Sequence, residues 1–252
     1  MPSAADLVIL VPALCAGALV LATHVPLGRL VLERGIVFID LAIAQTAGLG
    51  GALAQALGWE TDGLALQLSA FGAALAAALL LHWTERKLAA VQEAVIGVVF
   101  VATASLEILL TSFNPHGAEH LKDLLAGQIL WVGPAQLGLA ALATLPLLVG
   151  LARFDLRHHR ALFYPLFAAA VTVSVQLVGV YLVFASLILP ALAGRGRQHS
   201  LRVGVLVGSL GYLLGGFASL VWDLPTGAVI VCALALCAAP WIHPGIMLRL
   251  SP

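Results

Sequence analysis

Charged residues are scarce in this sequence. Only 10% of its 252 residues are Asp, Glu, Lys or Arg, whereas 62% are hydrophobic. A soluble domain carries about 25% charged residues to cover its surface. Most of the outer surface of this chain must therefore face lipid, which indicates an integral membrane protein.

Several functional signatures are also missing. The chain has no G-x-x-x-x-G-K-[ST] stretch, so it cannot supply a P-loop ATPase. Cys15, Cys232 and Cys237 lie in apolar runs without C-x-x-C spacing and are expected to pack rather than to bind metal. Asp6, with no basic segment before the first apolar run, argues against a cleaved signal peptide. The net charge is zero and the basic residues are confined to loops, so nothing indicates nucleic-acid binding.

Long apolar runs make up most of the chain. They are continuous over about 20 residues, as helices that cross a bilayer require, and do not alternate as in a membrane β-barrel. The sequence therefore predicts an all-α, polytopic transmembrane bundle in a single domain, residues 1–252. The clearest runs cover 7–25, 36–58, 63–82, 94–111, 133–151, 162–193, 203–222 and 226–242.

The gaps between these runs alternate in charge. Because cytoplasmic loops collect Lys and Arg, we place every basic gap inside, which leaves only Lys122 of the twelve Lys and Arg residues outside. The run 162–193 then has basic gaps at both ends and must leave and return to the same side. We expect two short crossings that turn near Gln176 and Gly179, and nine crossings in all, with the N-terminus outside. One long tilted helix, and eight crossings, is the alternative.

Three stretches, at residues 25–54, 176–197 and 219–236, together resemble the permease subunits of zinc/manganese-type ABC importers. Residues 25–54, VPLGRLVLERGIVFIDLAIAQTAGLGGALA, resemble the second-helix region of that family. Residues 176–197, QLVGVYLVFASLILPALAGRGR, resemble its segment that ends in an apolar-Pro-Ala run before a cytoplasmic turn. The most specific stretch is SLVWDLPTGAVIVCALAL at 219–236, where DLPTGA opens the last helix as in the family.

The resemblance implies a transport subunit and not an enzyme. Such permeases form a homodimer around the translocation path in the bacterial inner membrane and import divalent zinc or manganese, which an external metal-binding protein delivers. A separate cytoplasmic ATPase binds the ATP and drives the switch between outward- and inward-facing states, so the permease keeps no permanent cofactor. Residues 194–202 would form the segment that couples to the ATPase, with Arg195 and Arg197 on the inner side.

The second-helix region departs from the family pattern of Asp-x-x-x-His. Alignment through AQTAGLG puts Leu41 at the Asp position and Gln45 at the His position, with Asp40 one residue earlier. A shift of one residue turns a side chain by about 100° around a helix. A neutral amide is also a poor ligand for Zn²⁺ compared with imidazole. Either the ion is held loosely, or the cargo is another metal complex or small solute.

Two acids lie within the apolar runs, Asp40 and Glu107. Because charge inside the bilayer is costly, such residues usually face a cavity or a partner. Asp40, Gln45 and Glu107 are therefore the candidates for the translocation path. The structural alternatives are an ion pair between Asp40 and Arg34, helix packing or snorkelling of Glu107, and an interhelical hydrogen bond from Gln45.

Residues 114–120, NPHGAEH, contain the H-x-x-E-H order of some zinc peptidases. Gly117 weakens a helix there, and the chain has no soluble domain to hold a peptide substrate, so a membrane metallopeptidase is a distant alternative. The other interpretations are an external metal contact at the mouth of the path and a plain polar loop. These concern His116, Glu119 and His120.

The remaining polar residues receive structural roles. We expect Asp223, with Pro225 and Gly227, to shape the entry to the last helix by accepting hydrogen bonds from backbone N–H groups. Interfacial or solvated positions are expected for four histidines: His24, His82, His158 and His159.

Overall fold

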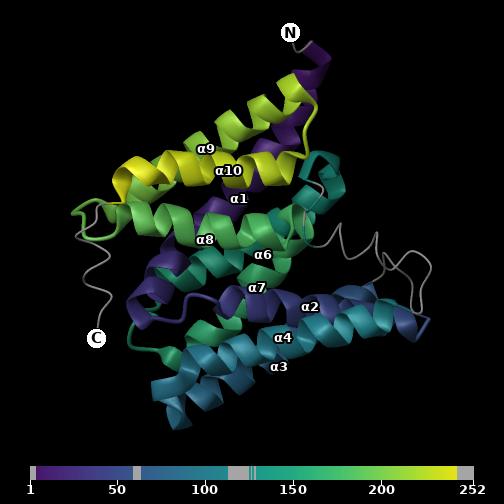
Figure 1. Ribbon diagram of the computed structural model, residues 1–252, viewed down its shortest axis with the longest axis vertical. Coiled ribbons are helices and arrows are strands. Elements are labelled where there is room, and N and C mark those ends of the chain that lie inside the picture. The colour runs from purple at the N-terminus through teal and green to yellow at the C-terminus, as the bar shows by residue number, and fades with distance from the viewer. Residues whose placement is uncertain (1–3, 59–63, 113–124, 126, 128, 243–252) are drawn as a thin grey trace.

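The chain is a bundle of helices (Figure 1). The computed structural model describes residues 4–58, 64–112, 125, 127 and 129–242, and within them no strand occurs. Nine α-helices have described bounds: α1 (Ala4–Arg34), α2 (Ile39–Ala56), α3 (Leu64–Lys87), α4 (Gln92–Thr111), α6 (Pro134–Arg153), α7 (Arg160–Val178), α8 (Val180–Gly194), α9 (Ser200–Trp222) and α10 (Thr226–Ala238). Three short 3-10 helices flank them: η1 (Ala89–Val91), η2 (Ile129–Trp131) and η3 (Ala239–Trp241).

The helices match the demands of a bilayer, in which every backbone polar group must be satisfied within the protein. Among the described residues, six helical segments are long and apolar enough to cross a membrane. They lie in α1, α3, α4, α6, α7 and α9. Helix α8 and the segment Thr226–Trp241 are apolar but shorter. Helix α2 spans 18 residues and carries several polar side chains. The predicted polytopic helical bundle is confirmed.

The long apolar run 162–193 is broken at Gly179, as predicted. Gly179 has φ 80° and ψ 164°, a conformation that is essentially restricted to glycine, and it ends α7 and begins α8. Two contacts cover the broken helix end. The side-chain amide of Gln136 donates to the carbonyl of Gln176 at 3.0 Å, and Gly127 lies so close to the Val178 carbonyl that a Cβ there would overlap it. The two flanking helices therefore run in opposite directions.

Helix α1 is longer than predicted. The apolar run 7–25 ends at a proline, but the helix continues through Pro26 to Arg34. Proline is tolerated in a membrane helix when neighbouring helices compensate for the lost hydrogen bond. The prediction of an interfacial His24 is therefore wrong: the side chain is fully buried, and Nδ1 lies 2.9 Å from Thr23 Oγ1 and 3.1 Å from the Val20 carbonyl.

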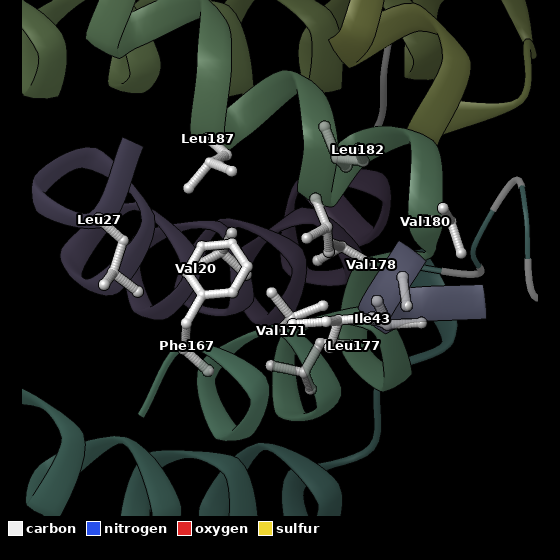
Figure 2. Close-up of a cluster of buried hydrophobic side chains, with 14 of the residues drawn as sticks. Val20, Leu27, Ile43, Phe167, Val171, Leu177, Val178, Val180, Leu182 and Leu187 are labelled. Atoms are coloured by element: carbon white, nitrogen blue, oxygen red, sulfur yellow. The ribbon is translucent and has the colours of Figure 1, made fainter. Parts of the chain in front are cut away.

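The helices form two groups that are joined by α1 and α7. Helices α2, α3 and α4 pack together on one side, and α8, α9 and α10 pack together on the other. Figure 2 shows buried side chains of α1, α2, α7 and α8 meeting between the groups, among them Ile43, Phe167 and Leu187. Helices α1 and α8 approach closely at Gly28, where a Cβ would overlap the Leu187 carbonyl. The helix ends that carry basic residues lie on one side of the bundle. The α8–α9 turn is one of them and lies at the left of Figure 1, whereas the α9–α10 turn lies at the other end of α9.

Substituting Gly179→Ala should destabilise the bundle by about 1–3 kcal/mol, because alanine is strained in this backbone conformation. Gly72→Ala, in α3 with no atom within 4 Å of the added Cβ, should be neutral or stabilising by about 0.5–1 kcal/mol. Thermal unfolding of the detergent-purified variants compares the two. Equal stability of both variants would contradict the assigned break.

Candidate translocation groove

A groove of about 530 Å³ opens between the two helix groups. Its walls come from α2 and α4 on one side and from α8 and α10 on the other, with one residue from the segment before η2. The lining is apolar except for the Gln45 amide and the Tyr181 hydroxyl. We call it the α2–α8 groove; its residues are Leu41, Gln45, Phe100, Leu125, Val180, Tyr181, Phe184, Ala185, Ile188, Leu189 and Val231.

Helix α2 presents Leu41 and Gln45 to this groove. Residues four apart lie on the same face of a helix, so the two positions share the groove-facing side. Gln45 is 4% exposed, and its Oε1 is buried without a hydrogen-bond partner among the described residues. The groove therefore contains one buried amide oxygen that is available as an acceptor.

Asp40 is placed differently. It is 1% exposed and is not among the residues that line the α2–α8 groove. Its Oδ1 accepts a hydrogen bond from the Leu41 backbone N–H at 2.9 Å. The alternative of an ion pair with Arg34 is not seen in the described residues, because the Arg34 guanidinium donates to the Leu156 carbonyl at 2.7 Å and lies over the Phe163 ring. The structure thus separates Asp40 from Gln45, as the one-residue offset requires.

Glu107 lies on α4 seven residues beyond the groove residue Phe100, and therefore on the same face of that helix, about two turns further along. Its side chain is fully buried, and neither carboxylate oxygen has a hydrogen-bond partner among the described residues. Such a buried, unpaired carboxylate is costly. Like Asp40, Glu107 is not among the residues that line the α2–α8 groove.

The N-terminal end of α2 is attached to both walls of the groove. The Phe38 ring stacks on that of Phe184 in α8, with centroids 6.0 Å apart. The Phe38 backbone N–H donates to Glu93 Oε1 on α4 at 3.2 Å. Phe38 itself is 49% exposed, so this contact lies at the edge of the groove.

The other predicted site residues lie away from the groove. Arg195 and Arg197 belong to the α8–α9 turn. The external candidates His116, Glu119 and His120 lie outside the described residues. Within the part of the chain that the structure describes, no group of three or more His, Cys, Asp or Glu side chains is arranged to hold a metal ion.

The α9–α10 turn differs in detail from the prediction. Asp223 adopts a left-handed conformation with φ 50° and ends α9. It does not cap α10, whose first turn has no side-chain cap. The turn is held by Ser219, whose hydroxyl donates to the Leu224 carbonyl at 2.7 Å and lies 2.5 Å from Thr226 Oγ1. Serine and threonine can bind nearby backbone groups in this way, and the hydroxyl rather than the carboxylate fixes the entry to α10.

Sequence reasoning missed most of the groove wall. Helix α8 contributes six of the lining residues, from Val180 to Leu189. The sequence of this helix is apolar on all sides, so no hydrophobic periodicity marks its groove-facing side. The only signal was the resemblance of the segment 176–197 to the permease family.

A polytopic helical bundle with a groove between two helix groups fits a membrane transport protein. The sequence pattern of the ABC 3 transport family matches residues 6–158 and 152–241, so the chain belongs to this family. It is a multi-pass permease subunit of a metal-type ABC transporter, not an enzyme.

Similar proteins agree with this assignment. A Haemophilus influenzae protein described as a probable iron transport system membrane protein is 27% identical over 229 residues, which cover 81% of this chain and 79% of that protein. The fold is similar to a chain of PsaBC from Streptococcus pneumoniae, solved in complex with Fab, with a TM-score of 0.71, 20% identity, and coverage of 96% and 94%. It is also similar to an inward-facing transporter assigned to the metal-chelate ABC type, with a TM-score of 0.67, 18% identity, and coverage of 94% and 85%.

Cysteine labelling tests which face of α2 lines the groove. In a background without the three native cysteines, Leu41→Cys and Gln45→Cys should react with a small water-soluble thiol reagent faster than Asp40→Cys. The reason is that positions 41 and 45 line the groove, where a water-soluble reagent can reach them, whereas position 40 does not. Labelling rates are read by mass spectrometry of protein in membrane vesicles. Faster reaction at position 40 than at position 45 would contradict the placement.

Proposed function

We propose that this chain is the membrane-spanning subunit of an ATP-driven importer of transition metal. It works as a homodimer in which two copies of the α2–α8 groove face a shared path. A separate cytoplasmic ATPase powers the change of access, and an external binding protein delivers the cargo. The observation that carries the proposal is the groove between two helix groups in a chain of the ABC 3 transport family.

The lining of the groove favours a metal that arrives with its own ligands. A bare divalent ion would have to exchange its water for carboxylate, imidazole or thiolate ligands, but the groove offers one amide and one phenol hydroxyl among apolar side chains. Leu41 and Gln45 stand where the resemblance expects Asp and His. A groove of about 530 Å³ also falls in the range of small-molecule sites. A metal complex would present an exterior that such a surface can contact.

The second candidate is bare zinc or manganese, the cargo that the family resemblance implies. The relatives are described by other cargo: one as a probable iron transport system membrane protein and one as a metal-chelate type transporter. The two candidates differ in whether the chain's own side chains must coordinate the ion.

Total cellular metal tests the transport function. Cells that lack this chain should accumulate less of one transition metal under limitation, and the intact chain should restore it. Gln45→Ala should restore uptake about two- to tenfold less well, because the loss of one hydrogen bond costs about 0.5–1.5 kcal/mol. Elemental mass spectrometry with salts or pre-formed chelates as the source gives the measurement.

A partner ATPase that cannot hydrolyse ATP is the control, and it should abolish rescue. No change of any transition metal on deletion would overturn the proposed cargo class. If metal salts restore uptake and pre-formed chelates do not, the transported cargo is the bare ion.

Metal binding by purified protein separates the two forms of cargo. The double variant Leu41→Asp/Gln45→His places a carboxylate and an imidazole four residues apart on the groove face, so it should retain Zn²⁺ in equilibrium dialysis. The wild-type chain should retain little, and the double variant should transport complexed metal poorly because a charge now lies in an apolar groove. If the wild type binds the bare ion as tightly as the variant, the bare-ion candidate is correct.

A further inference from the structure

A second cavity lies between α2, α3, α6 and α7. It measures about 590 Å³ and shares no lining residue with the α2–α8 groove. Its polar lining consists of one hydroxyl and four amides, from Thr172, Gln55, Gln67, Gln136 and Gln176. We call it the glutamine cleft. The other lining residues are glycine, alanine, valine and leucine, so none of the residues that line it is charged.

The glutamines stand at one end of the bundle. Two of them belong to the first turns of α3 and α6, and the other two to the last turns of α2 and α7. In α3 and α6 the basic residues stand at the other end of each helix. Because a helix of about 20 residues just spans the hydrocarbon core, its first turn lies at the level of the lipid headgroups. The cleft extends from there along α2 to Ala47, where its lining is apolar.

The wall between α2 and α3 is tightly packed beside the cleft. A Cβ on Gly50 would come within 2.7 Å of the Ser69 carbonyl oxygen, and the Ser69 hydroxyl donates to the Gly50 carbonyl at 2.7 Å. The next residue, Gly51, lines the cleft, and a Cβ there would have only Leu66 Cδ1 near it, at 4.0 Å. The cleft is therefore an open space next to closely packed helices, and not a region of loose packing.

The cleft opens between α3 and α6. Helix α7 packs on both of them, and α2 packs on α3, but α3 and α6 do not pack closely on each other within the described residues. Gln67 on α3 and Leu139 on α6 line the cleft and are exposed. An occupant can therefore enter sideways from the bilayer and keep an apolar part between two helices that face lipid.

The polar groups of the cleft suit an uncharged partner. The Gln136 amide donates to the Gln176 carbonyl at 3.0 Å, and the Thr172 hydroxyl donates to the Ala168 carbonyl at 2.8 Å. These bonds hold both side chains in place, and the oxygen of each can still accept a hydrogen bond. Amides both donate and accept without carrying charge, as hydroxyl groups do. A phosphate would bring a charge that no residue of the lining neutralises.

We propose that the glutamine cleft binds a membrane lipid whose headgroup is uncharged and rich in hydroxyl groups, as in a glycolipid. The glutamine amides exchange hydrogen bonds with the headgroup, and an acyl chain lies along the apolar lining between α3 and α6. The volume of the cleft falls in the range of small-molecule sites. The inference does not rest on the proposed function, because the cleft is separate from the α2–α8 groove.

Lipid retention by the full chain tests the proposal. The purified protein is mixed with equal amounts of a galactosyl diacylglycerol and a phosphatidylglycerol that have the same acyl chains, and native mass spectrometry counts the lipid retained. We expect the wild type to prefer the galactolipid about tenfold, as two hydrogen bonds would give. Gly51→Leu fills the cleft and should abolish the preference. Gly72→Leu, in α3 with no atom within 4 Å of an added Cβ, is the matched control and should keep it.

A second variant removes one amide and leaves the shape of the cleft nearly unchanged. Gln67→Leu should lower the preference about threefold, because one hydrogen bond is lost. If Gly51→Leu does not fold, as judged by thermal unfolding, Gln67→Leu decides the proposal: a lowered preference supports it, and an unchanged one overturns it.

The remaining outcomes also decide the proposal. A preference for the galactolipid in the wild type and in Gly72→Leu, but not in folded Gly51→Leu, supports it. Equal or stronger retention of phosphatidylglycerol by the wild type overturns it, as does an unchanged preference in Gly51→Leu. Methyl galactoside, which has the headgroup without the acyl chains, should not displace the galactolipid at equal concentration. Displacement would identify a soluble sugar as the ligand and overturn the assignment to a lipid.

Discussion

The arrangement of the bundle depends on how one interrupted helix is satisfied within the membrane. A chain that reverses inside an apolar environment leaves carbonyl and amide groups without helical partners, and lipid offers none. At Gly179 the chain reverses with a backbone conformation that only glycine adopts easily. The carbonyl of Gln176 is covered by the Gln136 side chain, and Gly127 allows a neighbouring segment to approach Val178. The reversal is therefore fixed by α6 and by the segment before η2, and not by α7 and α8 alone.

This reversal produces the groove. It turns α8 back through the bundle, where the helix packs on α1 and α9 and exposes one side to α2 and α4. Close packing makes this possible, because Gly28 lets α1 and α8 approach at backbone distance. In lipid, small residues that permit such approach take over the role that hydrophobic burial has in water. The groove is thus the space left where α8 and α10 meet the α2–α4 group.

Most of the fold could be predicted from the sequence, since it follows from apolar length and from the distribution of Lys and Arg. The two basic gaps around 162–193 required an extra turn, and the turn lies at Gly179. The continuation of α1 through Pro26 could not be predicted, because proline ends helices in most settings and only the packing of neighbouring helices overrides it. The same error misplaced His24. Packing of this kind is not encoded in any local pattern.

The groove could be predicted only in part. The alignment through AQTAGLG indicated positions 41 and 45, and both lie on the groove face of α2. The α8 wall could not be found, because a helix that is apolar on every side gives no periodic signal. From the sequence, Asp223 is expected to accept hydrogen bonds from backbone N–H groups in the turn before α10. In the structure it is the shorter Ser219 side chain that bonds to the backbone there, at the Leu224 carbonyl. The distinction depends on side-chain reach within a turn and is not visible in residue type.

Contacts at the basic end of the bundle indicate which helices form a fixed frame. Arg34 on α1 joins the segment before α7 through the Leu156 carbonyl and lies 4.0 Å from the Phe163 ring centroid. Arg160 on α7 pairs with Glu85 on α3 at 3.5 Å. Glu85 is buried and Arg160 is exposed in this pair, and together these contacts tie α1, α3 and α7 at one end. The groove helices α2, α4 and α8 are linked near that end through the contacts of Phe38 with Glu93 and Phe184. A change of access that moves α8 relative to α2 would therefore break the Phe38–Phe184 ring contact and disturb the buried contacts between these two helices. The contacts of Arg34 and Arg160 involve neither helix and would remain.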